Sequence, residues 1–157
     1  MLNFILFLVI CALIALIIKS SIQNAKQAKI NIESQQAFLS ENKKRSEIIE
    51  TASGLQYEVI TPCDSGEQPT MQSNVTCHYH GTLLDGTVFD SSVERNTPLS
   101  FKLNQVIPGW TEVLQQMKCG EKVKAFIPYN LAYGKRAVGK IPPASLLVFE
   151  IELIAID

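Results

Sequence analysis

The sequence lacks an excess of charge of either sign. Its 14 basic and 15 acidic side chains leave a formal net charge of −1 over 157 residues. Proteins that bind nucleic acid usually present a strongly basic face, so this balance gives no electrostatic basis for nucleic acid as a partner. The length allows one ordinary domain and an appendage.

Cysteine is also scarce. Cys11 lies in an apolar run, and the rest of the chain contains three more, Cys63, Cys77 and Cys119. An odd number excludes a complete disulfide framework; one disulfide remains open as an alternative, but free thiols are the prediction. The spacings match no zinc motif, and the sequence shows no credible catalytic triad. We therefore expect neither a metal nor a cofactor.

The N-terminal segment is the most apolar part of the chain. Residues 2–18 contain no charged side chain, and Asn3 is their one polar residue. At 1.5 Å per residue, a helix of this length is roughly 25 Å long, at the short end for a membrane span. A cleaved signal peptide is the competing interpretation, but no Lys or Arg precedes the run, and the run exceeds the usual apolar core of such peptides. We therefore predict a retained membrane anchor at 1–19.

The lysines after this segment bear on its orientation. Lys19, Lys26 and Lys29 follow the span, whereas no basic residue precedes it. Taken alone, the preference of positive side chains for the cytoplasmic side places the folded domain in the cytoplasm.

Residues 20–50 are polar and contain neither proline nor glycine, so we expect a helical stalk. A weak apolar stripe runs along it, formed by Ile18, Ile22, Ala25, Ile32 and Leu39. The stripe is interrupted by Lys29 and Gln36. A solvated stalk is therefore favoured over a seam for a homodimer, which stays open as an alternative.

Residues 51–157 form the predicted domain. Alternating apolar and polar residues bounded by turn signals predict short strands, at 55–60, 74–84, 87–90, 99–103, 121–127 and 146–156. One short helix begins at Pro108, which suits a first helical position, and we expect Gly120 to end it. The fold class is therefore α+β: a twisted antiparallel sheet of about five strands, wrapped over one short α-helix.

The helix has one apolar face. Trp110, Val113, Leu114 and Met117 are spaced at i, i+3, i+4 and i+7. Other aromatic residues are spread around them in the sequence: Tyr79, Phe89, Phe101, Tyr133 and Phe149. Such a set either closes a core or floors an apolar pocket, and we assign Phe101 to the core. Asp90 is on its own consistent with a turn, and His78 and His80 with solvated strand residues.

Six short motifs decide between these alternatives. They are SGLQY (53–57), HYHG (78–81), DGTVFDSS (85–92), VIPGW (106–110), LAYG (131–134) and LVFE (147–150). In this order and spacing they resemble the FKBP-type peptidyl-prolyl cis-trans isomerases, in particular the bacterial macrophage-infectivity-potentiator branch. The resemblance covers roughly residues 37–157 and implies an anchored enzyme of the cell envelope or periplasm.

The resemblance also implies a pocket for proline-containing polypeptides and macrolide inhibitors. It implies that Trp110 is the floor and that the wall residues are Tyr79, Phe89, Val106, Ile107, Tyr133, Ile141 and Phe149. Asp90 would lie at the rim with Tyr79 and Arg95, and the Ile107 N–H and Tyr133 hydroxyl would bind substrate carbonyls. Leu99 occupies a position at which many members have an aromatic wall, so substrate preference and macrolide affinity stay open.

An apolar pocket also suits the chemistry of prolyl isomerisation. Rotation about an X–Pro bond is slow because it removes the amide resonance. The twisted amide has less charge on its oxygen than the planar form, so a pocket that excludes water favours it. The leading hypothesis is therefore a prolyl isomerase. A chaperone or peptide-binding module with little turnover is the main alternative, and a membrane tether with a vestigial pocket is a weaker one.

Overall fold

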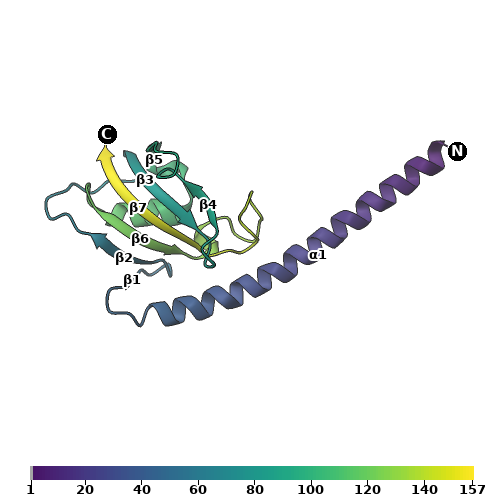
Figure 1. Cartoon of the computed structure of the whole chain (residues 1–157), viewed down its shortest axis with the longest axis horizontal. Helices are drawn as coiled ribbons and strands as arrows, with labels where there is room; N and C mark the ends of the chain where they lie inside the picture. The colour runs from purple at the N-terminus through teal and green to yellow at the C-terminus, as the bar shows by residue number, and fades with distance from the viewer. Residues whose placement is uncertain (1) are drawn as a thin grey trace.

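The computed structural model describes residues 2–157. One long helix precedes a domain made of strands, a short α-helix and two 3-10 turns (Figure 1). The elements are α1 (Leu2–Asn42), β1 (Ile49–Glu50), β2 (Gln56–Thr61), β3 (Asn74–Thr82), β4 (Val88–Ser91), β5 (Leu99–Lys102), η1 (Leu103–Gln105), α2 (Pro108–Gln116), β6 (Lys122–Ile127), η2 (Tyr129–Leu131) and β7 (Leu147–Ile156).

All strands belong to one antiparallel sheet. Its order is β1-β2-β6-β7-β3-β4, and β5 pairs with β3 beside this path. The predicted α+β class is confirmed, and the sheet of the described chain has seven strands instead of about five. The strand without a predicted range is β1, of two residues, whereas β5 is the strand predicted at 99–103 and pairs along the same edge of β3 as β4.

Strand periodicity places alternate side chains on one face of the sheet. In β3, Val75, Cys77 and Tyr79 are buried, as the alternation predicted. In β7, Phe149 and Ile151 are buried, whereas their neighbours are less so. Side chains two residues apart point to the same face of a strand, so these residues form one apolar surface.

Helix α2 packs against this surface. Trp110, Val113 and Leu114 are buried, as the spacing predicted, and Met117 is buried just beyond the helix. The expected helix end at Gly120 is wrong, because Met117 already has an extended backbone (φ −85°, ψ 152°). Gly120 instead has φ +92° and donates its N–H to the carbonyl of Leu153, so it forms a turn before β6.

Helix α1 covers part of the opposite face of the sheet. Phe38 and Leu39 pack against a second, smaller apolar cluster formed by Phe126, Leu146 and Val148. The Phe38 and Phe126 ring centroids are 5.5 Å apart. The C-terminal part of α1 is therefore docked on the domain, whereas a wholly solvated stalk was favoured.

The stalk also ends earlier than predicted. Its helix stops at Asn42, followed by turns and by β1, so helix over all of 20–50 is wrong. The Asn42 side chain is buried and donates a hydrogen bond to the side chain of Gln56, 2.9 Å away. Gln56 in turn donates to the Leu39 carbonyl over 2.9 Å. These bonds tie the end of the helix to β2 and turn the chain back into the sheet.

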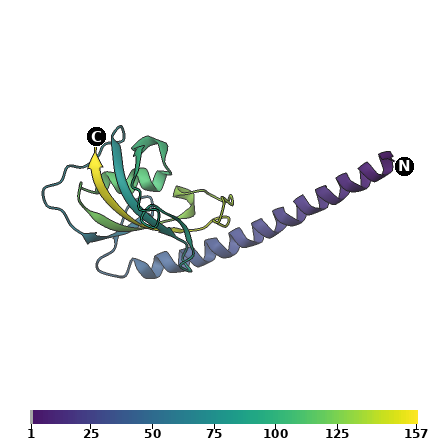
Figure 2. The same ribbon diagram turned by 45° about the horizontal axis from the view of Figure 1, so that its top comes forward.

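The N-terminal part of α1 projects from the domain (Figure 1, Figure 2). The apolar side chains of residues 9–18 are exposed. Within the described residues, α1 contains a stretch that is long and apolar enough to cross a membrane, judged by length and composition.

Candidate functional site

A cavity of about 670 Å³ opens between α2, the sheet and the loop after η2. We call it the proline pocket, after the ligand that the sequence resemblance predicts for it. It is lined by Tyr79, Phe89, Asp90, Leu99, Phe101, Gln105, Val106, Ile107, Trp110, Tyr133, Val138, Gly139, Lys140, Ile141 and Phe149. Every predicted site residue except Arg95 therefore lies in its wall, and Arg95 contacts two residues of that wall.

Trp110 forms the floor of the proline pocket. Only 6 % of its surface is exposed, yet it lines the cavity. Tyr79 and Phe149 meet the indole edge to face, with centroids 5.2 and 5.1 Å away and interplanar angles of 83° and 84°. Such perpendicular packing is favourable for aromatic pairs, so the floor is fixed by its neighbours and remains open above.

Phe89 and Phe101 complete the aromatic lining. Phe89 packs edge to face on Phe149, with centroids 5.3 Å apart. Phe101 packs against the core, as assigned, and it also lines the cavity, with its ring centroid 5.4 Å from that of Trp110. It is two residues from Leu99 in β5, and both lie on the same face. The position of Leu99 in the pocket was therefore the signal that could have placed Phe101 there.

Gly81 allows the two phenylalanine rings to come together. A Cβ atom at this position would lie 2.7 Å from Cζ of Phe89 and 2.8 Å from Cε1 of Phe149. Real Cβ atoms do not approach other atoms this closely. A glycine in β3 is therefore required by the packing of the pocket wall.

A polar network lies at the rim of the proline pocket. The Tyr79 hydroxyl donates a hydrogen bond of 2.5 Å to Oδ2 of Asp90. Arg95 forms an ion pair with Oδ1 of the same carboxylate and donates from Nη2 to the Tyr79 oxygen over 2.9 Å. Its guanidinium carbon lies 5.8 Å from the centroid of the Tyr79 ring. Asp90 is thus part of a three-residue cluster, which goes beyond the plain turn role that the sequence left open.

The surroundings shift the pKa values of this cluster. Burial raises the pKa of Asp90, but hydrogen bonds from Tyr79 and Arg95 outweigh it and leave the pKa below its ordinary value. Burial and the hydrogen bond to Asp90 raise the pKa of Tyr79. Near neutral pH the carboxylate is therefore charged and the phenol is neutral, which suits a fixed rim that donates and accepts hydrogen bonds.

The far wall comes from the loop between η2 and β7. Tyr133 and Ile141 line the cavity from this loop. The loop is folded by paired hydrogen bonds between the backbones of Val138 and Ile141, of 3.0 and 2.9 Å. Sequence reasoning missed Val138, Gly139 and Lys140 as lining residues. They have no periodic pattern, because their place depends on this turn.

The two histidines of β3 lie outside the proline pocket. Nδ1 of His78 is 3.0 Å from the Ser92 hydroxyl, and Nδ1 of His80 is 3.0 Å from the Ser91 hydroxyl. Both rings are half-buried, so they are more restrained than the solvated histidines expected. Within the described chain, no group of three potential metal ligands gathers around them or elsewhere.

An antiparallel sheet wrapped over a short helix, with an aromatic cavity between them, defines a known class of protein. The family model described as FKBP-type peptidyl-prolyl cis-trans isomerase matches residues 65–154. A second model, the domain amino terminal to FKBP-type peptidyl-prolyl isomerase, matches residues 12–59. The chain belongs to the FKBP-type family.

Particular relatives support this assignment. The FKBP-type peptidyl-prolyl cis-trans isomerase FkpA of Aeromonas hydrophila is 46 % identical over 88 % of this chain and 52 % of its own. The outer membrane protein MIP of Legionella longbeachae is 45 % identical over 90 % of this chain and 60 % of its own. The chain therefore spans about half to three fifths of the length of these two relatives.

Solved structures show the same fold. The crystal structure of FkpA from Escherichia coli matches with a TM-score of 0.88 and 39 % identity, over 95 % of this chain and 70 % of that one. A peptidyl-prolyl cis-trans isomerase from Pseudomonas syringae matches with a TM-score of 0.76 and 37 % identity, over 82 % of this chain and 95 % of that one.

Proposed function

We propose that this chain accelerates cis–trans rotation about X–Pro bonds in unfolded or extended polypeptides. The observation that carries the proposal is the open aromatic cavity of about 670 Å³ with the Trp110 indole as its floor. A cavity of this size is typical of small-ligand sites and accommodates a prolyl residue with its neighbours.

Each part of the lining has a distinct role in this proposal. The proline ring lies on Trp110, between the edges of Tyr79 and Phe149. Phe89, Leu99, Val106 and Ile141 exclude water from the remaining sides. The apolar walls therefore bind the ring through the apolar surface that is buried between them, and polar groups orient the peptide.

Two donors are suited to orienting the peptide. Ile107 immediately precedes α2, where the first N–H groups of a helix have no partner within it. Tyr133 lines the cavity with a hydroxyl-bearing side chain that is 40 % exposed. Both are assigned to substrate carbonyls. Asp90, Tyr79 and Arg95 form a fixed rim and transfer no proton.

The rate enhancement arises from differential binding. Planar amides carry more charge on oxygen than twisted ones, and water stabilises that charge. A site that replaces water by aromatic rings therefore destabilises the planar form relative to the twisted one. Every 1.4 kcal/mol, approximately, of this preference gives a tenfold higher rate, so a modest preference suffices for a reaction that takes tens to hundreds of seconds unaided.

We further propose that the N-terminal part of α1 anchors the domain to a membrane of the cell envelope. An exposed apolar stretch and a relative named as an outer membrane protein support this. Taken alone, the lysines that follow the apolar stretch favour a domain on the cytoplasmic side of the membrane. Labelling Cys63 and Cys119, both half-buried, with an impermeant thiol reagent on intact cells tests the topology: modification from outside supports the envelope, and modification only after lysis overturns it.

Two binding proposals follow from the same features. A macrolide inhibitor is expected to compete with peptide for the proline pocket. A homodimer is expected to use the exposed isoleucines of α1, such as Ile22, which is 65 % exposed. Protection of the protein from unfolding by a macrolide, and cross-linking of two chains through a cysteine at position 22, test these proposals separately.

The activity itself is tested with a Leu-Pro tetrapeptide and the full chain in zwitterionic micelles. We expect cis–trans exchange to be faster than the uncatalysed rate and to fall strongly in Phe89→Ala. Met71→Ala, an exposed position in the loop before β3, is the control and retains activity. An uncatalysed rate with the wild-type chain would contradict the proposal. Suppression of client aggregation that survives Asp90→Ala and Phe89→Ala would favour the binding module instead.

A further inference from the structure

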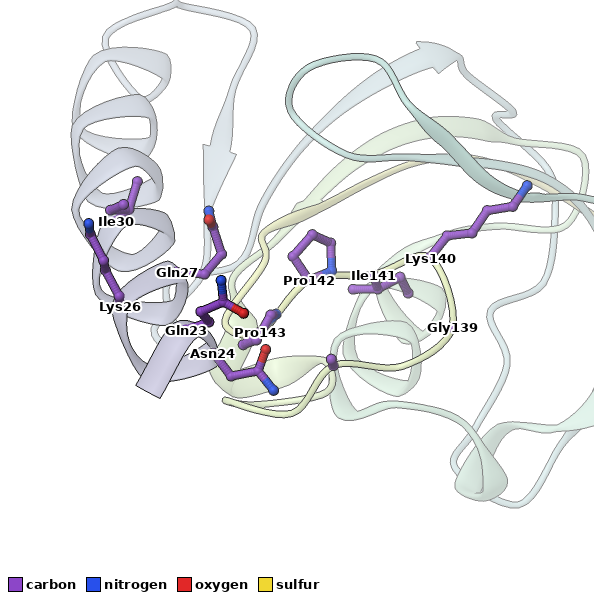
Figure 3. Close-up of a pocket in the computed structure, with 11 residues that line it drawn as sticks. Gln23, Asn24, Lys26, Gln27, Ile30, Gly139, Lys140, Ile141, Pro142 and Pro143 are labelled. Atoms are coloured by element: carbon purple, nitrogen blue, oxygen red, sulfur yellow. The ribbon is translucent and has the colours of Figure 1, made fainter. Parts of the chain in front are cut away.

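A second hollow lies beside the proline pocket, between α1 and the loop after η2 (Figure 3). We call it the helix–loop cleft. Its volume is about 640 Å³. Gln23, Asn24 and Gln27 line it from α1, and Pro142 and Pro143 line it from the loop. In Figure 3 the side chains of Gln23 and Asn24 extend from α1 toward the loop, whereas Gln27 runs along the helix, where it donates a hydrogen bond of 2.9 Å to Asn31.

The helix–loop cleft adjoins the proline pocket. Gly139, Lys140 and Ile141 line both hollows. A polypeptide that places its proline on Trp110 therefore needs to pass only this short ridge to enter the cleft. An extended chain covers about 3.3–3.6 Å per residue, so a substrate longer than a few residues is needed to fill both hollows at once.

The two walls of the cleft are held together by hydrogen bonds. Nδ2 of Asn31 donates to the Pro143 carbonyl over 2.8 Å, and Nε2 of Gln35 donates to the Ala144 carbonyl over 3.1 Å. Ala28, which lies along α1 between the cleft residues and Asn31, is also buried. The cleft is thus a fixed feature of the docked helix.

The lining chemistry indicates what occupies the cleft. Each amide side chain both donates and accepts hydrogen bonds, which matches the alternating N–H and C=O groups of an extended backbone. Ile30, Ile141 and the two prolines add apolar surface. Among the described residues that line the cleft there is no carboxylate, whereas Lys26 and Lys140 are present. The lining therefore accepts main chain of varied sequence and disfavours basic flanks.

We propose that the helix–loop cleft binds the segment of the client polypeptide that flanks the proline, through main-chain hydrogen bonds to Gln23 and Asn24. This inference rests on the proposed isomerase function and identifies its substrate as an extended chain. The stalk helix is then part of the substrate site, and a long peptide is a better substrate than a tetrapeptide.

The test measures kcat/KM of the full-length protein in zwitterionic micelles with two peptide substrates. One is a Leu-Pro tetrapeptide; the other carries the same core within twelve neutral residues. Because one neutral hydrogen bond is worth roughly a two- to tenfold change, we expect a long-to-short ratio in or above that range. In the double variant Gln23→Ala, Asn24→Ala the ratio falls toward one. Both substitutions favour helix, so folding is retained.

A matched control and a blocking variant sharpen the result. Gln36→Ala, Ser40→Ala changes two exposed α1 side chains outside the cleft and preserves the ratio. Asn24→Trp fills the cleft and lowers the ratio without removing a helix contact to the domain. Equal ratios in wild type and both cleft variants would overturn the inference, and so would an equal loss in the control.

Photocross-linking supplies a second readout. Long peptides carrying benzoylphenylalanine four residues before or after the proline are expected to label residues 23–30, with one of the two flanks dominating. Labelling that avoids α1 with both peptides would overturn the cleft assignment. So would a preference for the long peptide that vanishes when phospholipid nanodiscs replace the micelles, because lipid would then occupy the cleft. No turnover of the tetrapeptide would instead reject the isomerase function itself.

Discussion

The Gln35 side chain accepts a hydrogen bond of 3.1 Å from the backbone N–H of Tyr129, which lies 94 positions later in the chain. The same side chain donates to the Ala144 carbonyl. Tyr129 and Ala144 bound the loop that contributes Tyr133 and Ile141 to the proline pocket. One buried amide of the stalk therefore fixes both ends of the far wall of the site.

Replacing this amide is expected to destabilise the protein. Gln35→Leu leaves a part-buried N–H at Tyr129 and a buried carbonyl at Ala144 without their partner, and an unsatisfied buried group costs about 1–3 kcal/mol. Urea unfolding followed by fluorescence measures the loss. Gln36→Leu, at an exposed position next to it, is the control and stays close to wild type. Equal stability of the two variants would show that α1 does not dock through Gln35.

The docking of α1 shows where sequence reasoning ends. Ala28, Gln35 and Asn42 are spaced by seven residues and are the three most buried among the α1 side chains that the structure describes. Two of them are amides, and a search for apolar residues at helical spacing assigns amide side chains to the solvent-exposed face. The predicted stripe instead contains Ile22, which is 65 % exposed. Gln35 is buried because backbone groups of a distant loop bond to it, and Asn42 because its side chain bonds to that of Gln56 in β2.

The domain, by contrast, follows from local periodicity. The alternation in β3 and the i, i+3, i+4 spacing in α2 both face the core as predicted, since a repeated apolar pattern has only one face to bury. The loop residues Val138 to Lys140 were not predictable, because a turn closed by two backbone hydrogen bonds brings them to the pocket.

Asp90 predicts a pH dependence. Its folded pKa lies below the ordinary 3.8 despite burial, because Tyr79 and Arg95 bond the carboxylate. A carboxyl group whose pKa is lower in the folded than in the unfolded protein stabilises the folded state. This stabilisation is complete above the unfolded-state pKa and is lost as the pH falls through the folded-state pKa. We therefore expect stability to decrease below about pH 4. Asp90→Asn should be less stable near pH 7 and show a flatter acid dependence in thermal unfolding. An unchanged acid slope would contradict the rim network.

Gly81 predicts a steric effect on activity. In Gly81→Ala the new methyl group would meet the rings of Phe89 and Phe149 at under 3 Å, so the rings must move and the pocket wall opens. We expect a loss of kcat/KM of about tenfold or more, as for misplaced binding groups elsewhere. Gly54→Ala is the comparison, because its φ of +86° strains an alanine but no atom lies within 4 Å. It should cost about 1–2 kcal/mol of stability and leave turnover intact; a similar loss of turnover in both variants would point to general destabilisation.

Trp110 offers a direct signal of ligand binding, because it is the one tryptophan of the chain. A proline ring placed on the indole replaces water in the cavity and makes the surroundings of the fluorophore less polar. We expect the emission maximum to shift to shorter wavelength as a Leu-Pro peptide is added, with a midpoint that agrees with the KM when chemistry is slower than peptide dissociation. In Phe101→Ala, which removes a ring 5.4 Å from the indole, binding should weaken and the free protein should emit at longer wavelength. Peptide that is turned over without any change in Trp110 emission would show that the proline binds away from the indole, and the pocket assignment would then be wrong.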